Sequence, residues 1–82
     1  MNDLKERIRN VMVAVFAVEP TEIVEDAGPR VIESWDSLRH MNLVLALEEE
    51  FNIRFQDETI EQLLSLKLIE LFVQEELDKE KK

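Results

Sequence analysis

The most informative segment of the 82-residue chain runs from Asp36 to Phe51 and reads DSLRHMNLVLALEEEF. At about 100° per residue, its apolar residues fall on two sides of a helix. The first side, the core stripe, comprises Leu43, Val44, Leu47 and Phe51. The second side, the outer stripe, comprises Leu38, Met41 and Leu45. A small bundle buries one stripe, so the outer stripe is either covered by the bundle or its long loop, or exposed as an interaction site.

Helical patterns continue on both sides of this segment. Apolar residues recur at helical spacing over residues 3–18, where Asp3 is the expected N-cap. The same spacing recurs over residues 65–78, where Ser65 is the expected N-cap. Residues 57–63 suit a short helix. The expected fold is therefore all-α, a four-helix bundle with one short helix and a long first loop.

The long loop is residues 19–35, which hold the single glycine and both prolines of the chain. We expect its four β-branched apolar residues to attach it to the core: Ile23, Val24, Val31 and Ile32. A long ordered connection in a small domain is uncommon and is more often functional.

Composition limits the function classes. The chain carries 19 Asp and Glu against 10 Lys and Arg, a net charge of −9, with one His and no Cys. Its length predicts a single domain over residues 1–82. The absence of Cys excludes disulfides and Cys-based zinc sites, and we expect no permanent metal site. The acidity argues against nucleic acid and membrane surfaces and favours basic partners. We expect a cytoplasmic monomer.

Two serines, Ser34 and Ser37, lie at the start of the central helix, in the run Ser34-Trp35-Asp36-Ser37-Leu38. Ser and Asp are common helix caps, and this is the simplest interpretation. The Ser37 hydroxyl nevertheless follows a long loop and adjoins the outer stripe. The N–H groups of the first helical turn also favour an anion there. The position is therefore suited to carrying a phosphate ester.

The chain resembles the acyl carrier protein family over nearly its whole length. The resemblance is carried by Asp36-Ser37-Leu38, by Leu43-Val44 and by the run Ala46-Leu47-Glu48-Glu49-Glu50-Phe51. It implies that Ser37 carries 4′-phosphopantetheine, transferred from coenzyme A through a phosphodiester, and that Asp36 helps to hold Mg²⁺ during the transfer. The arm would hold acyl or aminoacyl groups as thioesters, and the chain would be a carrier rather than an enzyme.

The resemblance also implies partners. These are a phosphopantetheinyl transferase (the holo-carrier synthase), an acyl or aminoacyl ligase or synthase, and transferases with basic docking surfaces. The residues expected to face them are the outer stripe with two acidic residues: Leu38, Met41, Leu45, Glu48 and Glu49.

Three positions depart from the family pattern. Ser34 stands where many members have glycine, Asn42 replaces an acid, and Arg39 adds a positive charge beside Ser37. The pattern W-D-S-L-x-H-M is closer to discrete carriers of specialised pathways than to the carrier of fatty acid synthesis.

Two other interpretations remain open. The chain could be a helical adaptor without a prosthetic group, whose outer stripe docks a partner helix and whose Ser37 is only a cap. His40, one turn after Ser37, could also act as a base toward that hydroxyl, but no acid is placed to orient it. We expect His40 to pack locally against Trp35.

Overall fold

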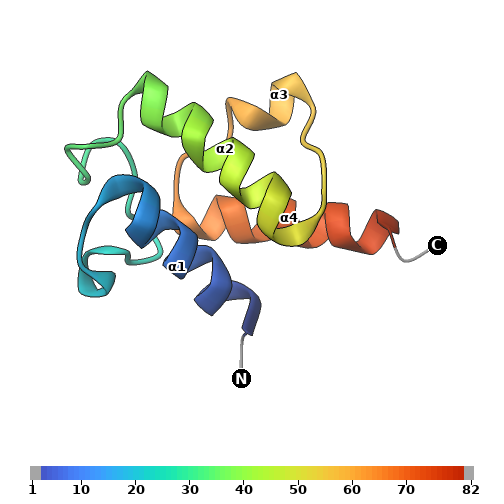
Figure 1. The fold of residues 1–82 in the computed structure, drawn as a ribbon, viewed down its shortest axis with the longest axis horizontal. Coiled ribbons are helices and arrows are strands. Elements are labelled where there is room, and N and C mark those ends of the chain that lie inside the picture. Colours follow the sequence, from blue (N-terminus) through green and yellow to red (C-terminus); the bar gives the residue numbers. More distant parts are fainter. Residues whose placement is uncertain (1–2, 81–82) are drawn as a thin grey trace.

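The computed structural model describes residues 3–80, and within them the chain is helical, with no strand. The α-helices are α1 (Asp3–Phe16), α2 (Ser37–Phe51), α3 (Asp57–Ile60) and α4 (Leu66–Glu80), and a 3₁₀ helix, η1, spans Pro20–Glu22. The long loop folds beside α1 and α2, and α3 stands over the far side of α2 (Figure 1). The all-α class, the short third helix and the long first loop are confirmed. None of the helices among the described residues has the length and apolarity needed to cross a membrane.

The core lies between α1, α2 and α4. Each of these helices contributes one apolar stripe, which fits their helical spacing of apolar residues. The buried helical residues are Ile8, Met12 and Phe16; Leu43, Val44, Leu47 and Phe51; and Leu66, Ile69 and Val73. The core stripe of the central helix is therefore confirmed.

Helix α1 ends two residues before the predicted boundary. Ala17 adopts a left-handed conformation (φ 56°) that closes the helix after Phe16. The carbonyl groups at this end are satisfied by residues far along the chain: the Ser34 hydroxyl donates to the Phe16 carbonyl (2.8 Å), and Arg39 Nη1 donates to the Val15 carbonyl (2.9 Å). These partners end the helix before Pro20 can do so, and Pro20 instead begins η1, which the sequence did not predict.

The remaining boundaries differ by a few residues. Helix α3 covers only Asp57–Ile60, because residues 61–62 form a turn, and α4 extends to Glu80. Ser65 caps α4 as predicted, since its Oγ accepts the backbone N–H of Leu68 (3.2 Å). Asp3 is not the N-cap of α1, because it already lies within the helix.

The long loop is attached to the core by a different set of residues from the one predicted. Ile23 and Ile32 are buried as expected. Val24 and Val31 are exposed, which corrects the prediction for both. Ala27 and Trp35 are buried in addition, so small and aromatic side chains replace the two valines in the contact with the core.

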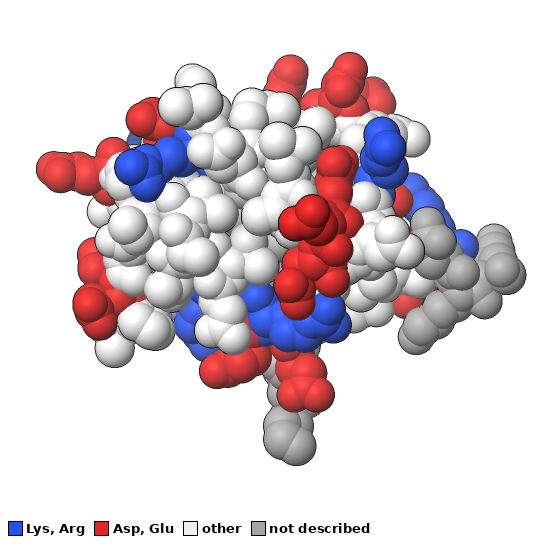
Figure 2. Space-filling view, viewed as in Figure 1, with Lys and Arg blue, Asp and Glu red and all other residues white. Residues whose placement is uncertain are grey.

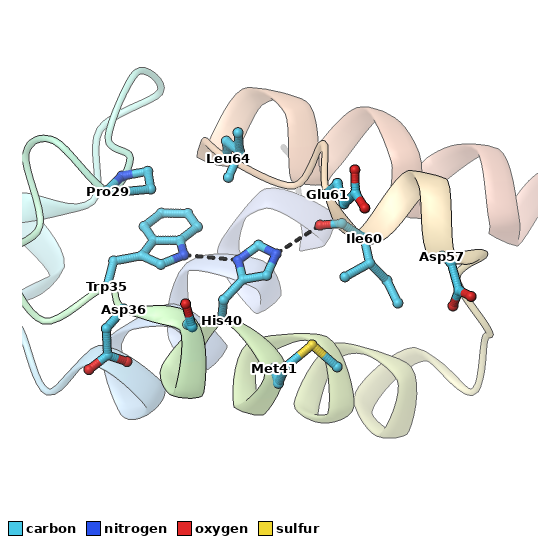
Figure 3. Close-up of a pocket in the computed structure, with 10 residues that line it drawn as sticks. Pro29, Trp35, Asp36, His40, Met41, Asp57, Ile60, Glu61 and Leu64 are labelled. Carbon is cyan, nitrogen blue, oxygen red and sulfur yellow. Dashed lines mark hydrogen bonds between the residues drawn. The ribbon is translucent and has the colours of Figure 1, made fainter.

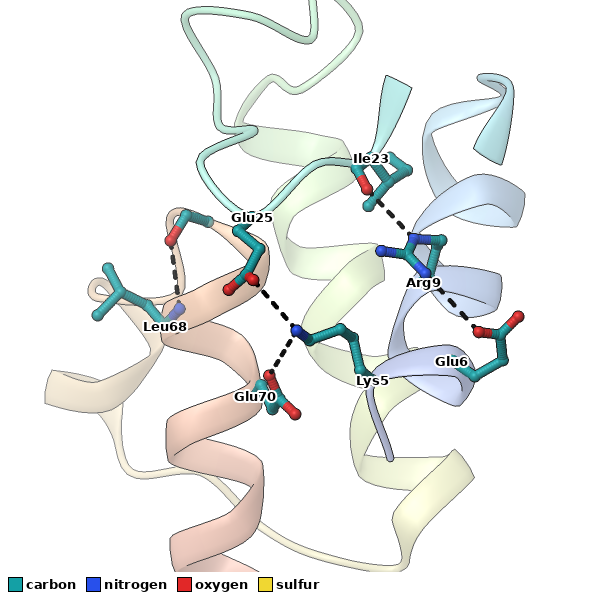
Figure 4. Close-up of polar contacts among 8 residues, drawn as sticks. Lys5, Glu6, Arg9, Ile23, Glu25, Leu68 and Glu70 are labelled. Atoms are coloured by element: carbon teal, nitrogen blue, oxygen red, sulfur yellow. Dashed lines mark hydrogen bonds and ion pairs between the residues drawn. The ribbon is translucent and has the colours of Figure 1, made fainter. Parts of the chain in front are cut away.

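Polar contacts also tie the loop to two helices (Figure 4). Lys5 of α1 lies 3.2 Å from a Glu25 carboxylate oxygen and 3.9 Å from one of Glu70 on α4. Arg9 Nε donates to the Ile23 carbonyl (3.2 Å). Exposed ion pairs of this kind contribute little to stability, typically about 0–1 kcal/mol.

Gly28 is the position in the loop where backbone packs most closely on backbone. A Cβ built at this residue would overlap the carbonyl oxygen of Leu64, which cannot rotate away as a side chain would. We expect Gly28→Ala to lower the free energy of unfolding by about 1–3 kcal/mol through overpacking. Urea melts compared with the exposed loop variant Glu33→Ala check this, and equal midpoints for the two variants would contradict it.

Candidate functional site

Ser37 is the first residue of α2, and Asp36 is its N-cap. Asp36 has an extended backbone, and its Oδ1 accepts the N–H of Arg39 at 2.8 Å. The Asp36 carbonyl accepts the N–H of His40 at 2.8 Å. Because Asp36 performs the capping, the interpretation of Ser37 as the cap is wrong. The Ser37 side chain is exposed and stands where the first N–H groups of the helix have no intrahelical acceptor.

Ser37 opens on a cleft of about 690 Å³. The cleft lies between the end of the long loop, the first turns of α2, and α3 with the turn that follows it (Figure 3). Its walls are largely apolar, with three carboxylates among the lining residues. The lining consists of Pro29, Trp35, Asp36, Ser37, His40, Met41, Asp57, Ile60, Glu61 and Leu64.

Trp35 and His40 form one wall of this cleft. Trp35 Nε1 donates to His40 Nδ1 (3.0 Å), and His40 Nε2 lies 2.7 Å from the Ile60 carbonyl oxygen. An indole N–H can only donate, so Nδ1 must accept and Nε2 must carry the proton. The expected packing of His40 against Trp35 is confirmed, since the two rings also stack with centroids 6.1 Å apart. Both imidazole nitrogens are engaged, so His40 is not available as a base for Ser37.

The outer stripe is exposed. Leu38, Met41 and Leu45 have exposed fractions of 72%, 45% and 60%, whereas Leu43 and Leu47 of the core stripe have none. The helical spacing of the apolar residues therefore predicted the two faces of α2 correctly. Met41 also lines the cleft, so the outer stripe borders the cleft at one residue. In Figure 2 the face that carries α2 has a broad uncharged surface, bordered by both acidic and basic side chains, with a column of acidic side chains across one half of it.

The two glutamates expected to face partners differ in their surroundings. Glu49 is exposed. Glu48 is half-buried, and its Oε2 accepts the backbone N–H of Phe55 at 2.9 Å, which fixes the chain after α2. The neighbouring Glu50 pairs with Arg7 of α1 (3.0 Å). Glu49 is therefore the member of the acidic run whose carboxylate is most open to a partner.

Two of the three departures from the family pattern have structural partners. Ser34 and Arg39 both satisfy carbonyl groups at the end of α1, as described above. The guanidinium of Arg39 is thus turned toward the negative end of a helix, where positive charge is favourable. Asn42 is exposed on α2, and nothing in the structure explains why it replaces an acid.

These features define a class: a small acidic helical domain with an apolar cleft beside the start of its central helix. At this helix start the domain presents an exposed serine hydroxyl that is not the helix cap. No protein-family model matches the chain. It is 37% identical over 67 residues to an acyl carrier protein of Zymomonas mobilis, covering 82% of this chain and 86% of that one. It is 32% identical over 77 residues to an acyl carrier protein of Phenylobacterium zucineum, covering 94% and 98%. The chain belongs to the acyl carrier protein family.

Proposed function

We propose that this protein is a discrete carrier that holds acyl or aminoacyl groups on a 4′-phosphopantetheine arm attached to Ser37. The observation that supports this most directly is the exposed Ser37 hydroxyl, which borders the cleft. Asp36 caps the helix, so the Ser37 hydroxyl is not needed as the cap. Membership of the acyl carrier protein family supports it independently. In this role the protein moves thioesters between enzymes in the cytoplasm, in a specialised pathway, and is not itself an enzyme.

The residues around Ser37 fit such a group. The N–H groups at the start of α2 and the positive end of the helix dipole favour a phosphodiester at this position. The Asp36 carboxylate is engaged by the Arg39 N–H, which reduces its repulsion of a neighbouring anion. Pro29, Trp35 and Leu64 give the cleft an apolar surface along which the arm can lie. The arm's terminal thiol supplies the chemistry, because it holds the acyl group as a thioester.

His40 does not supply the base for loading at Ser37. Forming the Ser37 ester joins Oγ to the pantetheine phosphorus of coenzyme A, breaks the bond from that phosphorus to the adenosine 3′,5′-bisphosphate leaving group, and releases the hydroxyl proton. His40, one turn away, has both nitrogens engaged. We therefore expect the partner transferase to provide the general base, and Mg²⁺ can be held jointly by that enzyme and Asp36.

The docking surface for such partners is the outer stripe with its acidic neighbours. Leu38, Met41 and Leu45 offer exposed apolar contact, and Glu49 offers charge for a basic partner. Glu48 remains part of this proposed surface, although its bond to Phe55 leaves one oxygen for a partner. The partners are the transferase and a charging ligase or synthase.

The main alternative is a helical adaptor without a prosthetic group. The exposed outer stripe is compatible with it, but an adaptor function does not explain an exposed serine hydroxyl that is not the cap of α2. Incubation with a promiscuous phosphopantetheinyl transferase, Mg²⁺ and coenzyme A, followed by intact-mass measurement, separates the two functions. A gain of one phosphopantetheine is expected. An unchanged mass, with a known carrier protein loaded in parallel, would favour the adaptor.

Salt should act in opposite directions on stability and on partner encounter. At a net charge of −9 the acidic side chains repel one another in the folded state, and added salt screens this repulsion. We expect the melting temperature to rise between low salt and about 0.1 M, where the Debye length is about 10 Å. Stopped-flow association with the transferase should slow over the same series, because steered on-rates fall with ionic strength. An on-rate that does not change with salt would remove charge from the docking proposal.

A further inference from the structure

His40 joins two parts of the chain that are distant in sequence. Its Nδ1 accepts from Trp35 at the end of the long loop, and its Nε2–H donates to the Ile60 carbonyl at the end of α3 (Figure 3). We call this pair of hydrogen bonds the His40 bridge. Both bonds have short, favourable donor–acceptor distances, 3.0 and 2.7 Å. The bridge crosses the cleft wall beside Ser37.

The two ends of the bridge are anchored very differently. Trp35 is buried and stacks on Phe16, with ring centroids 4.5 Å apart, so the core holds it directly. Helix α3 has four residues and no buried side chain. A helix of one turn is not stable without tertiary contacts, so α3 depends on what holds it from outside.

Phe55 and Leu63, on either side of α3, are buried in the core, and polar contacts add to this anchoring at the end of α3. The Ile60 carbonyl also accepts the N–H of Leu63, but at 3.4 Å, much longer than the 2.7 Å to His40. Ile60 itself is half-buried against the core. The bond to the imidazole is therefore the shorter of these two contacts of the carbonyl, and it links the end of α3 directly to α2.

We propose that His40 is a positioning residue that fixes α3 relative to Trp35 and α2, and thereby keeps the shape of the cleft along which the arm lies. This rests on the proposed function, because the cleft matters only if Ser37 carries the arm. With the bridge intact, the group on the arm is sheltered between Trp35 and Ile60. Without it, α3 moves away from α2 and the group is exposed to water.

Two conservative variants each keep one of the two hydrogen bonds of the His40 bridge. In His40→Asn, the side-chain oxygen lies near the place of Nδ1, so it can accept from Trp35, but the side chain is too short to reach Ile60. In His40→Gln, the terminal amide lies near the place of Nε2 and can donate to the Ile60 carbonyl. The Asn variant therefore loses the α3 half of the bridge, whereas the Gln variant keeps the α3 half and loses the Trp35 half.

Amide hydrogen exchange of the unmodified protein is the first measurement. In His40→Asn, exchange at Ile60 and Leu63 should quicken about threefold to tenfold, as for the loss of one net hydrogen bond, with α1 and α4 unchanged. In His40→Gln, exchange should stay within about twofold of the parent. Equal exchange in the two variants would overturn the proposal. ¹⁵N NMR of the parent imidazole adds a test that needs no variant: the Nε2–H tautomer is expected, and the Nδ1–H tautomer would overturn it.

The second measurement uses the arm. Parent and variants are loaded at Ser37 with an acyl pantetheine, and cleavage of the thioester by hydroxylamine is timed. Cleavage should be about threefold to tenfold faster in His40→Asn and should return to the parent rate in His40→Gln. Equal cleavage rates in all three proteins would overturn the sheltering role. Failure of the parent to load, seen by intact mass, would overturn the proposed function instead, and the exchange result would still decide whether His40 holds α3.

Discussion

Ser37→Ala is expected to fold like the parent and to gain no mass with transferase, Mg²⁺ and coenzyme A. The loss of loading should be complete, because no other hydroxyl can take the place of Ser37. Folding should be preserved because Asp36, and not Ser37, caps α2. The thermal melt should therefore shift little, while intact mass shows only the unmodified chain.

Ser34 and Ser65 are the matched controls for this result. The Ser34 hydroxyl donates to the Phe16 carbonyl, and the Ser65 oxygen accepts from the Leu68 N–H, so both are used structurally. Ser34→Ala and Ser65→Ala should load fully and lose some stability, about 0.5–2 kcal/mol for the cap at Ser65. An arm found on Ser34 or Ser65 would show that the site has been assigned to the wrong residue.

Leu47→Ala and Leu45→Ala should have different consequences, because the two residues are only two positions apart on α2 but lie on different faces of it. Leu47 is fully buried, so truncation leaves a cavity and should cost about 2–5 kcal/mol in the free energy of unfolding. Leu45 is 60% exposed, so its truncation should cost about 1 kcal/mol or less. Loading by the transferase should fall sharply for Leu45→Ala, because the outer stripe is the proposed docking surface.

Denaturant melts and transferase kinetics together test this pair. For Leu47→Ala, loading is measured at a temperature where the variant is folded, and there it should stay close to that of the parent. A larger stability loss for Leu45→Ala would mean that the two faces of α2 had been exchanged. Normal loading of Leu45→Ala would remove this residue from the docking surface.

The sequence predicted those features that depend on local pattern. The two faces of α2 follow from helical spacing, and the start of α2 follows from Asp36, because a cap lies within four residues of the N–H group it binds. Contact between Trp35 and His40 was predicted for the same reason, since they are five residues apart across a helix start.

The features that were missed depend on partners distant in sequence. The early end of α1 depends on Ser34 and Arg39, which reach the Phe16 and Val15 carbonyls from 18 and 24 residues away. A carbonyl group carries no sequence signal, so the bond from His40 to Ile60, 20 residues on, could not be read from the chain. We did not predict that Val24 and Val31 are exposed. In the structure Ala27 and Trp35 pack against the core in their place.

The ties from Ser34 and Arg39 to the end of α1 have a consequence for the energetics of association. Both residues lie within three positions of Ser37, and a third bond, from the Arg39 N–H to Asp36, lies between them. The segment presented to a partner is thus already ordered in the free protein. Ordering such a segment on binding would cost about 0.5–1.5 kcal/mol for each immobilised side chain, and here that entropy is lost during folding instead. A partner can then dock onto the Ser37 segment largely as a rigid body, and differences in affinity among partners should appear mainly in their dissociation rates.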